Sequence, residues 1–297
     1  NDGSFLKNIN KKRVKCLGID PSKIACDYAR KKKLNVINDF FSKRLAKNIV
    51  KQHGQADIIF SANTLAHVEN LKDVLEGVDI LLSEEGELYI ENIYLHTLIE
   101  KNLFDQLYHE HIYTYSVESI NNIFSKYNLF IDKINFNKMQ GGSFLIKLTR
   151  KNKNKKKIQD IIKKENNKSF FKINKKLKIN KRIESAIYNF KRLIFKIKKN
   201  NNIFTGYGAS AKSVMLINLL GLTKKDLKFV VDNTKTKQNK LIPGTNIPIV
   251  APKKTKNYLG LYCILFSWNF EKEIIKKEKN RNIITKWLIP MPKIKII

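Results

Sequence analysis

At Ala56-Asp57-Ile58-Ile59-Phe60-Ser61-Ala62 the chain has a short, mostly apolar run, and Asn63-Thr64-Leu65-Ala66-His67 follows it directly. An apolar run of this length predicts a strand of a parallel β-sheet. In open α/β sheets, ligands bind beyond the carboxyl ends of the strands. We therefore expect Asn63 and His67 to lie on the ligand-binding edge of such a sheet.

Similar runs occur on both sides of this strand. We expect further strands at residues 14–19, 36–41 and 87–92, with an amphipathic helix at 71–82. The alternation of short strands with helices is typical of a doubly wound parallel sheet, so the expected fold class is α/β. Residues 129–136 and 142–149 predict an antiparallel pair of strands that completes this first unit.

A second α/β unit follows a lysine-rich segment. Residues 151–201 combine a basic run of low complexity with apolar residues at helical spacing, and they predict a helical connector. Beyond it, strands are expected at 203–205, 227–231 and 262–266. The turn Gly206-Tyr207-Gly208-Ala209-Ser210-Ala211-Lys212-Ser213 joins the first of these strands to a helix. It either holds a phosphate at the helix N-terminus, with Lys212, or is a Rossmann-like turn that binds nothing.

The net charge is +32, from 58 lysines and arginines against 26 aspartates and glutamates. Such a charge can indicate a nucleic-acid partner or an acidic substrate. Lysine greatly outnumbers arginine, however, whereas bidentate recognition of phosphates and bases favours arginine. The abundance of lysine, asparagine and isoleucine is typical of an AT-rich genome. The composition therefore argues against a nucleic-acid partner, although the positive field would favour a polyanionic substrate.

The cysteines and the apolar runs indicate the cellular compartment. Cys16, Cys26 and Cys263 are odd in number and scattered, as in a reduced cytoplasmic protein with no disulfide framework and no zinc-ligand spacing. No run of about 18 apolar residues predicts a membrane span. The chain begins at Asn1 rather than at methionine, so we interpret it as a fragment or a processed form. We expect a cytoplasmic monomer.

One stretch beyond the strand at 87–92 concentrates proton-transfer groups, Phe104-Asp105-Gln106-Leu107-Tyr108-His109-Glu110-His111-Ile112-Tyr113. Two of the five histidines in the chain lie there. General acid–base catalysis requires such groups within reach of one another. Taken alone, the stretch is better explained as a polar surface loop. Its position after a strand of the expected sheet favours a ligand site.

Two other segments have features of a nucleoside-binding site. Asp20 ends the strand at 14–19, where an acidic residue can accept hydrogen bonds from both hydroxyls of a ribose. A helix cap at Asp20 or Ser22 is the alternative. Asn1-Asp2-Gly3 predicts a loop that enters a helix, in which Gly3 can adopt a positive φ and expose backbone N–H groups.

These motifs together resemble those of the sugar C-methyltransferases, class I enzymes that use S-adenosylmethionine (SAM) and carry an additional C-terminal Rossmann-like domain. The matching segments follow the order of that family: 1–3, 18–22, 39–41, 62–67, 104–111, 206–213, 243–249 and 267–270. The resemblance implies a class I methyltransferase-type doubly wound sheet followed by a second Rossmann-like α/β domain. It implies three parts: a methyltransferase domain that lacks its first strand at 1–150, the basic connector at 151–201 and the C-terminal domain at 202–297.

The resemblance also implies a reaction. SAM would methylate a carbon next to the keto group of a nucleotide-linked deoxysugar, after a base has removed the proton from that carbon. His111 is the candidate base, and Glu110 would orient or assist it. Tyr108 and His67 would line the sugar pocket and polarise the carbonyl. His109 lies outside the matched pattern and is expected to be a bystander.

The same resemblance implies the ligand contacts. The expected cofactor-binding residues are Asn1, Asp2, Gly3, Asp20, Asp39, Phe40 and Asn63. Gly208 and Lys212 are expected at the diphosphate or nucleotide of the substrate. Members of this family usually begin with a cysteine-rich zinc-binding domain that is absent here. We therefore expect zinc only if the full protein has that domain, and no metal site within these residues.

Three other functions are compatible with parts of the sequence. The positive charge suggests a nucleic-acid-associated protein built on two Rossmann units. A methyltransferase that acts on another small molecule would use the same motifs. A nicotinamide-dependent oxidoreductase could use the turn at 206–213, but the second half of the chain has no catalytic set of its own, so it ranks last.

Overall fold

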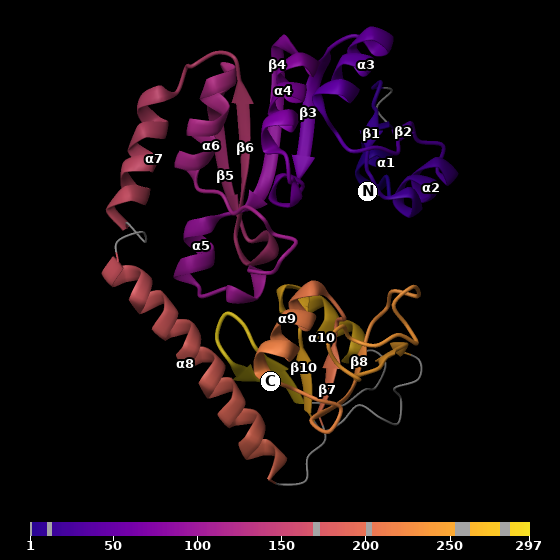
Figure 1. Ribbon diagram of the computed structural model, residues 1–297, viewed down its shortest axis with the longest axis vertical. Helices are drawn as coiled ribbons and strands as arrows, with labels where there is room; N and C mark the ends of the chain where they lie inside the picture. Colours follow the sequence, from indigo (N-terminus) through magenta and orange to yellow (C-terminus); the bar gives the residue numbers. More distant parts are fainter. Residues whose placement is uncertain (1, 11–13, 169–172, 200–203, 253–261, 280–285) are drawn as a thin grey trace. The chain divides into compact units, whose positions relative to one another are not determined.

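The computed structural model describes residues 2–10, 14–168, 173–199, 204–252, 262–279 and 286–297, and its secondary structure is mixed α/β (Figure 1). The expected α/β class is confirmed. Two compact units are present. The first comprises Asn1–Glu91, Glu118–Asn135 and Leu145–Gln159, and the second comprises Asn92–Val117, Phe136–Phe144 and Asp160–Ile297. The expected domain boundaries at 150 and 201 stay a prediction.

The first unit begins with a small parallel pair of strands and three helices. The elements are α1 (Ser4–Asn10), β1 (Gly18–Ile19), α2 (Lys23–Lys31), β2 (Val36–Ile37) and α3 (Lys43–His53). Serine caps begin two of the helices: Ser22 accepts a hydrogen bond from the N–H of Ala25, and Ser42 accepts one from the N–H of Leu45. Each cap satisfies a backbone donor that the helix itself leaves open. The helix expected after Asp20 is confirmed.

A four-stranded sheet follows, in the order β3-β4-β6-β5. Its strands are β3 (Ala56–Ala62), β4 (Leu82–Ile93), β5 (Phe130–Asn137) and β6 (Ser143–Thr149). β3 and β4 run parallel, and α4 (Leu71–Leu81) joins them. Short helical segments, η1 (Leu65–His67), α6 (Val117–Phe124) and η3 (Ser125–Tyr127), lie in the connections. The expected strands at 56–62 and 87–92 and the helix at 71–82 are confirmed.

The strand β3 has a mostly apolar sequence but is not buried. Ile58 is 63% exposed and Phe60 is 37% exposed. In the order of the described strands, β3 lies at the end of its sheet and pairs with β4 alone. The ring of Phe5 stacks on that of Phe60 with 4.4 Å between centroids.

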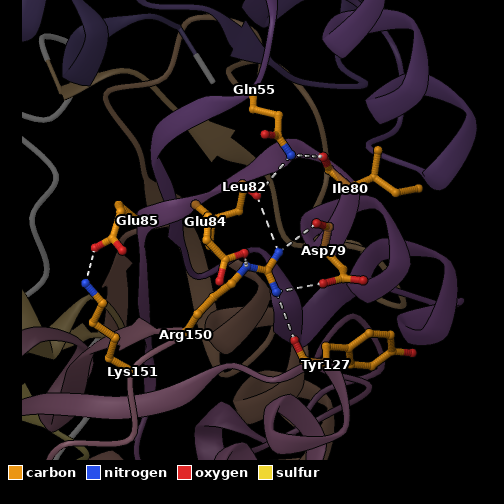
Figure 2. Close-up of polar contacts among 9 residues, drawn as sticks. All are labelled: Gln55, Asp79, Ile80, Leu82, Glu84, Glu85, Tyr127, Arg150 and Lys151. Carbon is orange, nitrogen blue, oxygen red and sulfur yellow. Dashed lines mark hydrogen bonds and ion pairs between the residues drawn. The ribbon is translucent and has the colours of Figure 1, made fainter.

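Arg150 holds together the end of α4, the start of β4 and the segment before β5 (Figure 2). Nη2 donates to the carbonyl oxygen of Asp79 at 2.9 Å, while Nη1 donates to Asp79 Oδ1 at 3.0 Å and to the carbonyl oxygen of Tyr127 at 3.2 Å. Gln55 donates to the carbonyl oxygens of Ile80 and Leu82. A helix leaves its last carbonyls without internal partners, and these two side chains satisfy them.

The second unit contains a six-stranded sheet in the order β12-β11-β10-β7-β8-β9. The strands are β7 (Phe204–Tyr207), β8 (Leu227–Val231), β9 (Ile249–Val250), β10 (Tyr262–Leu265), β11 (Lys286–Ile289) and β12 (Lys295–Ile296). All neighbouring pairs are parallel except β11 and β12, which are antiparallel. The expected strands at 203–205, 227–231 and 262–266 are thereby confirmed, except that residue 203 lies outside the described residues.

The helices of the second unit are α5 (Leu95–Glu100), α8 (Ile173–Lys198), α9 (Ala211–Leu220) and α10 (Glu271–Lys279), with the short turns η2 (Phe104–Gln106), η4 (Met139–Gly141) and η6 (Trp268–Phe270). The basic segment is helical as expected, in α7 (Lys155–Lys168) and α8. Phe190, Ile194 and Ile197 of α8 belong to the same hydrophobic core as Phe204 and Phe266. One face of α8 is therefore part of this core. In the described part of the chain, no helix is long and apolar enough to cross a membrane.

Candidate active site

The histidine-rich stretch belongs to the second unit, and its first three residues are buried whereas most of the others are exposed. It begins with η2, directly after α5. Leu103 and Phe104 anchor this turn in the hydrophobic core, and Asp105 and Gln106 are fully buried beside them. Because two apolar residues and two polar residues in sequence are all buried, the backbone that leads to His111 has a defined position.

His111 and Tyr108 form a hydrogen-bonded pair. The Nε2 atom of His111 lies 2.8 Å from Tyr108 Oη, and its Nδ1 atom lies 2.8 Å from the carbonyl oxygen of Gln106. A carbonyl oxygen can only accept, so in the neutral ring we assign the proton to Nδ1. Nε2 then accepts the hydroxyl proton of Tyr108. This assignment leaves Nε2 as the basic atom of the ring.

The environment keeps Tyr108 protonated. Burial, together with the nearby negative charges of Glu110 and Asp105, raises the pKa of Tyr108 to about 12. Tyr108 is therefore a hydrogen-bond donor at neutral pH, and the expected polarisation of a carbonyl by this residue stays a prediction. A Tyr–His pair of this kind combines a proton acceptor with a hydroxyl donor.

Glu110 lies between Tyr108 and His111 in the sequence, but its carboxylate is near His109. Its Oε1 atom is 3.9 Å from Nε2 of His109, and both side chains are exposed. The assisting role expected of Glu110 and the bystander role expected of His109 both remain predictions. Glu110 contributes to the raised pKa of Tyr108, so its negative charge acts on the Tyr108 side of the pair.

A buried polar cluster lies behind this turn, within the second unit. Trp268 Nε1 donates to Asp105 Oδ2 at 2.5 Å. Gln106 Nε2 donates to the carbonyl oxygen of Gln140 at 3.1 Å, and Lys212 Nζ donates to Gln140 Oε1 at 3.2 Å. Sequence reasoning assigned no role to Asp105, Gln106, Gln140 or Trp268. These residues lie in segments that match the family or form a predicted turn, and this was the only hint in the sequence. No local pattern predicts that they contact one another.

In the glycine-rich turn at 206–213, backbone donors are hydrogen-bonded to side chains of the protein itself. Gly208 has φ +92°, and a Cβ atom there would lie 2.0 Å from Ser267 Oγ. The N–H of Ala209 donates to Asp232 Oδ2 at 2.7 Å, and Ser210 caps α9. The backbone N–H of Ala209 is therefore already hydrogen-bonded to a carboxylate of the protein. Lys212 is only 8% exposed. This arrangement favours the alternative of a Rossmann-like turn over a phosphate contact.

In the first unit, the segment before α1 is capped and closely packed. Asp2 accepts hydrogen bonds from the N–H and the hydroxyl of Ser4, at 3.1 and 2.8 Å, and it pairs with Lys32. The hydrogen bonds from Ser4 lower the pKa of Asp2. Gly3 has φ +76°, and a Cβ atom there would lie 2.4 Å from Leu34. The positive φ expected of Gly3 is confirmed, whereas Asn1 lies outside the described residues.

The remaining cofactor candidates directly follow the strands of the first unit. Asp20 ends the segment after β1, and its Oδ1 accepts from the N–H of Ser22 at 2.8 Å. Asp39 follows β2 and pairs with Arg44 at 3.1 Å, while the ring of the next residue, Phe40, is 73% exposed. Because β1 and β2 are paired in parallel, Asp20 and Asp39 lie at the same edge of the small sheet.

Asn63 and His67 follow β3, as expected. Asn63 adopts a left-handed conformation with φ +52°, and its N–H donates to the carbonyl oxygen of Glu91 in β4 at 2.7 Å. His67 is exposed at the end of η1. It belongs to the first unit, whereas Tyr108 and His111 belong to the second. In the ranges that the structure describes, no three His, Cys, Asp or Glu side chains are grouped so as to hold a metal ion.

Comparisons with known proteins agree with these motifs. The model of the C-methyltransferase C-terminal domain matches residues 138–292, and a methyltransferase domain model matches residues 1–134. The C-methyltransferase NovU of Streptomyces niveus is 25% identical over 301 residues, which cover 100% of this chain and 72% of NovU.

Solved structures of SAM-dependent methyltransferases are more distantly similar. One from Anabaena variabilis has a TM-score of 0.42 at 17% identity, over 50% of this chain and 74% of its own. One from Archaeoglobus fulgidus has a TM-score of 0.42 at 14% identity, over 50% of this chain and 81% of its own. At these TM-scores the similarity supports no functional conclusion.

Proposed function

Because the chain belongs to the C-methyltransferase family, we propose that it transfers a methyl group from SAM to a carbon next to the keto group of a nucleotide-linked sugar. The family assignment confirms the enzyme class expected from the sequence, a SAM-dependent C-methyltransferase. The keto nucleotide-sugar and the enolate mechanism are the further steps of our proposal.

The single observation that supports the mechanism best is the Tyr108–His111 pair. A carbon becomes a nucleophile when a base removes a proton α to a carbonyl, and the resulting enolate needs a hydrogen-bond donor. In our proposal, Nε2 of His111 takes this proton and the ring becomes imidazolium. The electron pair of the broken C–H bond moves into the enolate, whose oxygen accepts a hydrogen bond from Tyr108.

The charge of the imidazolium would be stabilised on two sides. Its Nδ1–H already donates to the carbonyl oxygen of Gln106, and this hydrogen bond is kept when the ring is protonated, whereas the Tyr108 hydroxyl turns from Nε2 to the enolate oxygen. The carboxylate of Glu110 lies close enough to raise the pKa of Tyr108, and a negative charge there would also favour a protonated His111. This supports the assisting role that we propose for Glu110.

The cofactor residues of the first unit fit a nucleoside. Asp20 and Asp39 follow two neighbouring parallel strands, where ribose hydroxyls are commonly bound, and the exposed ring of Phe40 offers a face to a base. We propose that these residues, with Asp2, Gly3 and Asn63, hold the cofactor, and that Asn1 belongs with them. When bound, SAM supplies a sulfonium methyl group, to which the enolate carbon forms its new bond as the S–CH3 bond breaks.

The proposal also includes His67, the substrate and the cellular location of the protein. His67 would polarise the keto group together with Tyr108. The nucleotide-sugar would be the partner, and the protein would act in the cytoplasm as a monomer. For Gly208 and Lys212 we do not keep the expected diphosphate contact, because both are packed within the second unit.

The test compares His111→Ala with His109→Ala, in the full protein, against a panel of keto nucleotide-sugars in D2O. Without SAM, the wild type should exchange the sugar proton next to the keto group for deuterium, and with SAM it should methylate the same carbon. His111→Ala should lose both reactions by at least about 100-fold while it still binds SAM. His109→Ala should retain both. Turnover that is unchanged in His111→Ala would remove the base from the proposal, and methylation of another class of small molecule would replace the substrate.

A further inference from the structure

We propose that Trp268, Lys212 and Gln140 position the turn that carries the Tyr108–His111 pair, through Asp105 and Gln106. The inference rests on the proposed function for its kinetic part. All of these residues belong to the second compact unit. They act as positioning residues: Trp268 and Gln140 are hydrogen-bonded to the turn, and Lys212 is hydrogen-bonded to Gln140.

The first link runs through Gln106, which is tied at both its backbone and its side chain. Its carbonyl oxygen accepts the Nδ1 proton of His111 at 2.8 Å. Its side-chain amide donates to the carbonyl oxygen of Gln140 at 3.1 Å, and the residue is buried. A shift of Gln106 would therefore move the acceptor that selects the tautomer of His111.

The second link is the hydrogen bond from Trp268 to Asp105. These residues are 163 positions apart in the chain, yet Nε1 of Trp268 lies 2.5 Å from Oδ2 of Asp105. Asp105 is 0% exposed and precedes Gln106 directly. A buried carboxylate without a partner is costly, so the indole N–H holds this residue, and with it the turn, in place.

The third link is Lys212, whose positive charge compensates the negative charge of Asp105. Its Nζ atom donates to Gln140 Oε1 at 3.2 Å and lies 5.2 Å from the centroid of the Trp268 ring. Burial lowers the pKa of Lys212 and raises the pKa of Asp105, and each charge opposes the shift of the other. The loss of either charge would leave the other buried without compensation.

Close packing completes the arrangement. Gly141 has φ +91°, and a Cβ atom there would lie 2.7 Å from the ring of Trp268 and 2.8 Å from Leu103. The turn η4 can therefore approach both the indole and the start of η2. This approach brings Gln140 within reach of Gln106 and Lys212, so a glycine at 141 is required for the network.

The experiment follows the tautomer of His111 by NMR of protein labelled with 15N at histidine, in the wild type, Trp268→Phe and Lys212→Met. The His111 signal is assigned by its loss in His111→Asn. The wild type should show the Nδ1–H tautomer. Both variants should shift toward Nε2–H, because the carbonyl of Gln106 is no longer held. Phe270→Leu, an exposed residue of the same turn as Trp268, and Lys286→Met, an exposed lysine, are the matched controls and should keep the wild-type tautomer.

Kinetics separate positioning from substrate binding. Trp268→Phe and Lys212→Met should lower kcat by about 10- to 100-fold and alter the pH profile of kcat/KM, with little change in the KM for the sugar. A wild-type tautomer and kcat in both variants would overturn the inference. So would a raised sugar KM in Lys212→Met with an unchanged tautomer, which would assign Lys212 to the substrate phosphate instead. If the wild type methylates no keto nucleotide-sugar, the proposed function fails, while the tautomer measurement still decides the network.

Discussion

Replacement of Arg150 by alanine should destabilise the first unit locally, around the junction of α4 and β4. The guanidinium makes three hydrogen bonds of 2.9 to 3.2 Å, to the backbone and the carboxylate of Asp79 and to the backbone of Tyr127 (Figure 2). A net value of about 1 kcal/mol for each hydrogen bond gives a loss of about 3 kcal/mol. The contact with Glu84 adds little, because that carboxylate is exposed.

Amide hydrogen exchange measured by mass spectrometry on peptides that cover residues 71–93 is the suitable assay. A loss of about 3 kcal/mol corresponds to exchange that is about 100-fold faster, if these amides open together. Arg150→Lys should fall between the wild type and Arg150→Ala, since lysine keeps the charge but has no planar fork.

Lys151→Ala is the matched control. Lys151 is the next residue and makes an ion pair with Glu85, but both side chains are exposed. Such a surface pair contributes between 0 and about 1 kcal/mol. If the amides of Arg150→Ala exchange no faster than those of Lys151→Ala, hydrogen bonds from the guanidinium to the last carbonyls of α4 do not stabilise this junction. The reasoning is then refuted.

Two further predictions concern the second unit. Burial raises the pKa of Tyr108 from 10.0 to about 12, so its contribution to stability is fully present below pH 10 and is lost as the pH rises through 12. Tyr108→Phe should therefore show a smaller alkaline loss of stability than the wild type in urea unfolding between these pH values, and identical pH slopes would contradict this. Gly208→Ala should cost more than Gly221→Ala by about 2 kcal/mol or more, because both glycines have a positive φ but only at Gly208 would the new Cβ meet another residue. Equal melting temperatures of the two variants would count against the steric reason.

The sequence predicts those parts of the fold that depend on local patterns. Apolar runs identified β3, β4 and β8, and Ser22 indicated the start of α2. Burial depends on neighbours that a local pattern does not contain. Ile58 has the pattern of a core strand, but β3 has only one described neighbouring strand, so its side chain is largely exposed.

The candidate site shows the same limit. The concentration of Tyr108 and His111 in one stretch indicated acid–base chemistry, and the structure brings this pair within hydrogen-bond distance. The tautomer was not predictable, because it depends on which atom faces Nδ1. Lys212 was expected at a phosphate because lysines beside glycine turns often bind one. Its burial beside Trp268 arises from packing between segments that are distant in the sequence.

The proposed network also gives a physical reason why two matched domains occur on one chain. Asp105, Gln106 and His111 lie within the residues that the methyltransferase domain model matches, 1–134. Gln140, Lys212 and Trp268 lie within the C-terminal match, 138–292. In the proposed network, the indole N–H of Trp268 donates to Asp105 and the carbonyl oxygen of Gln140 accepts from Gln106, so the candidate base is supplied by one matched region and oriented by the other. A methyltransferase domain without residues 138–292 would keep His111 in its sequence but lose the hydrogen bonds that hold Asp105 and Gln106.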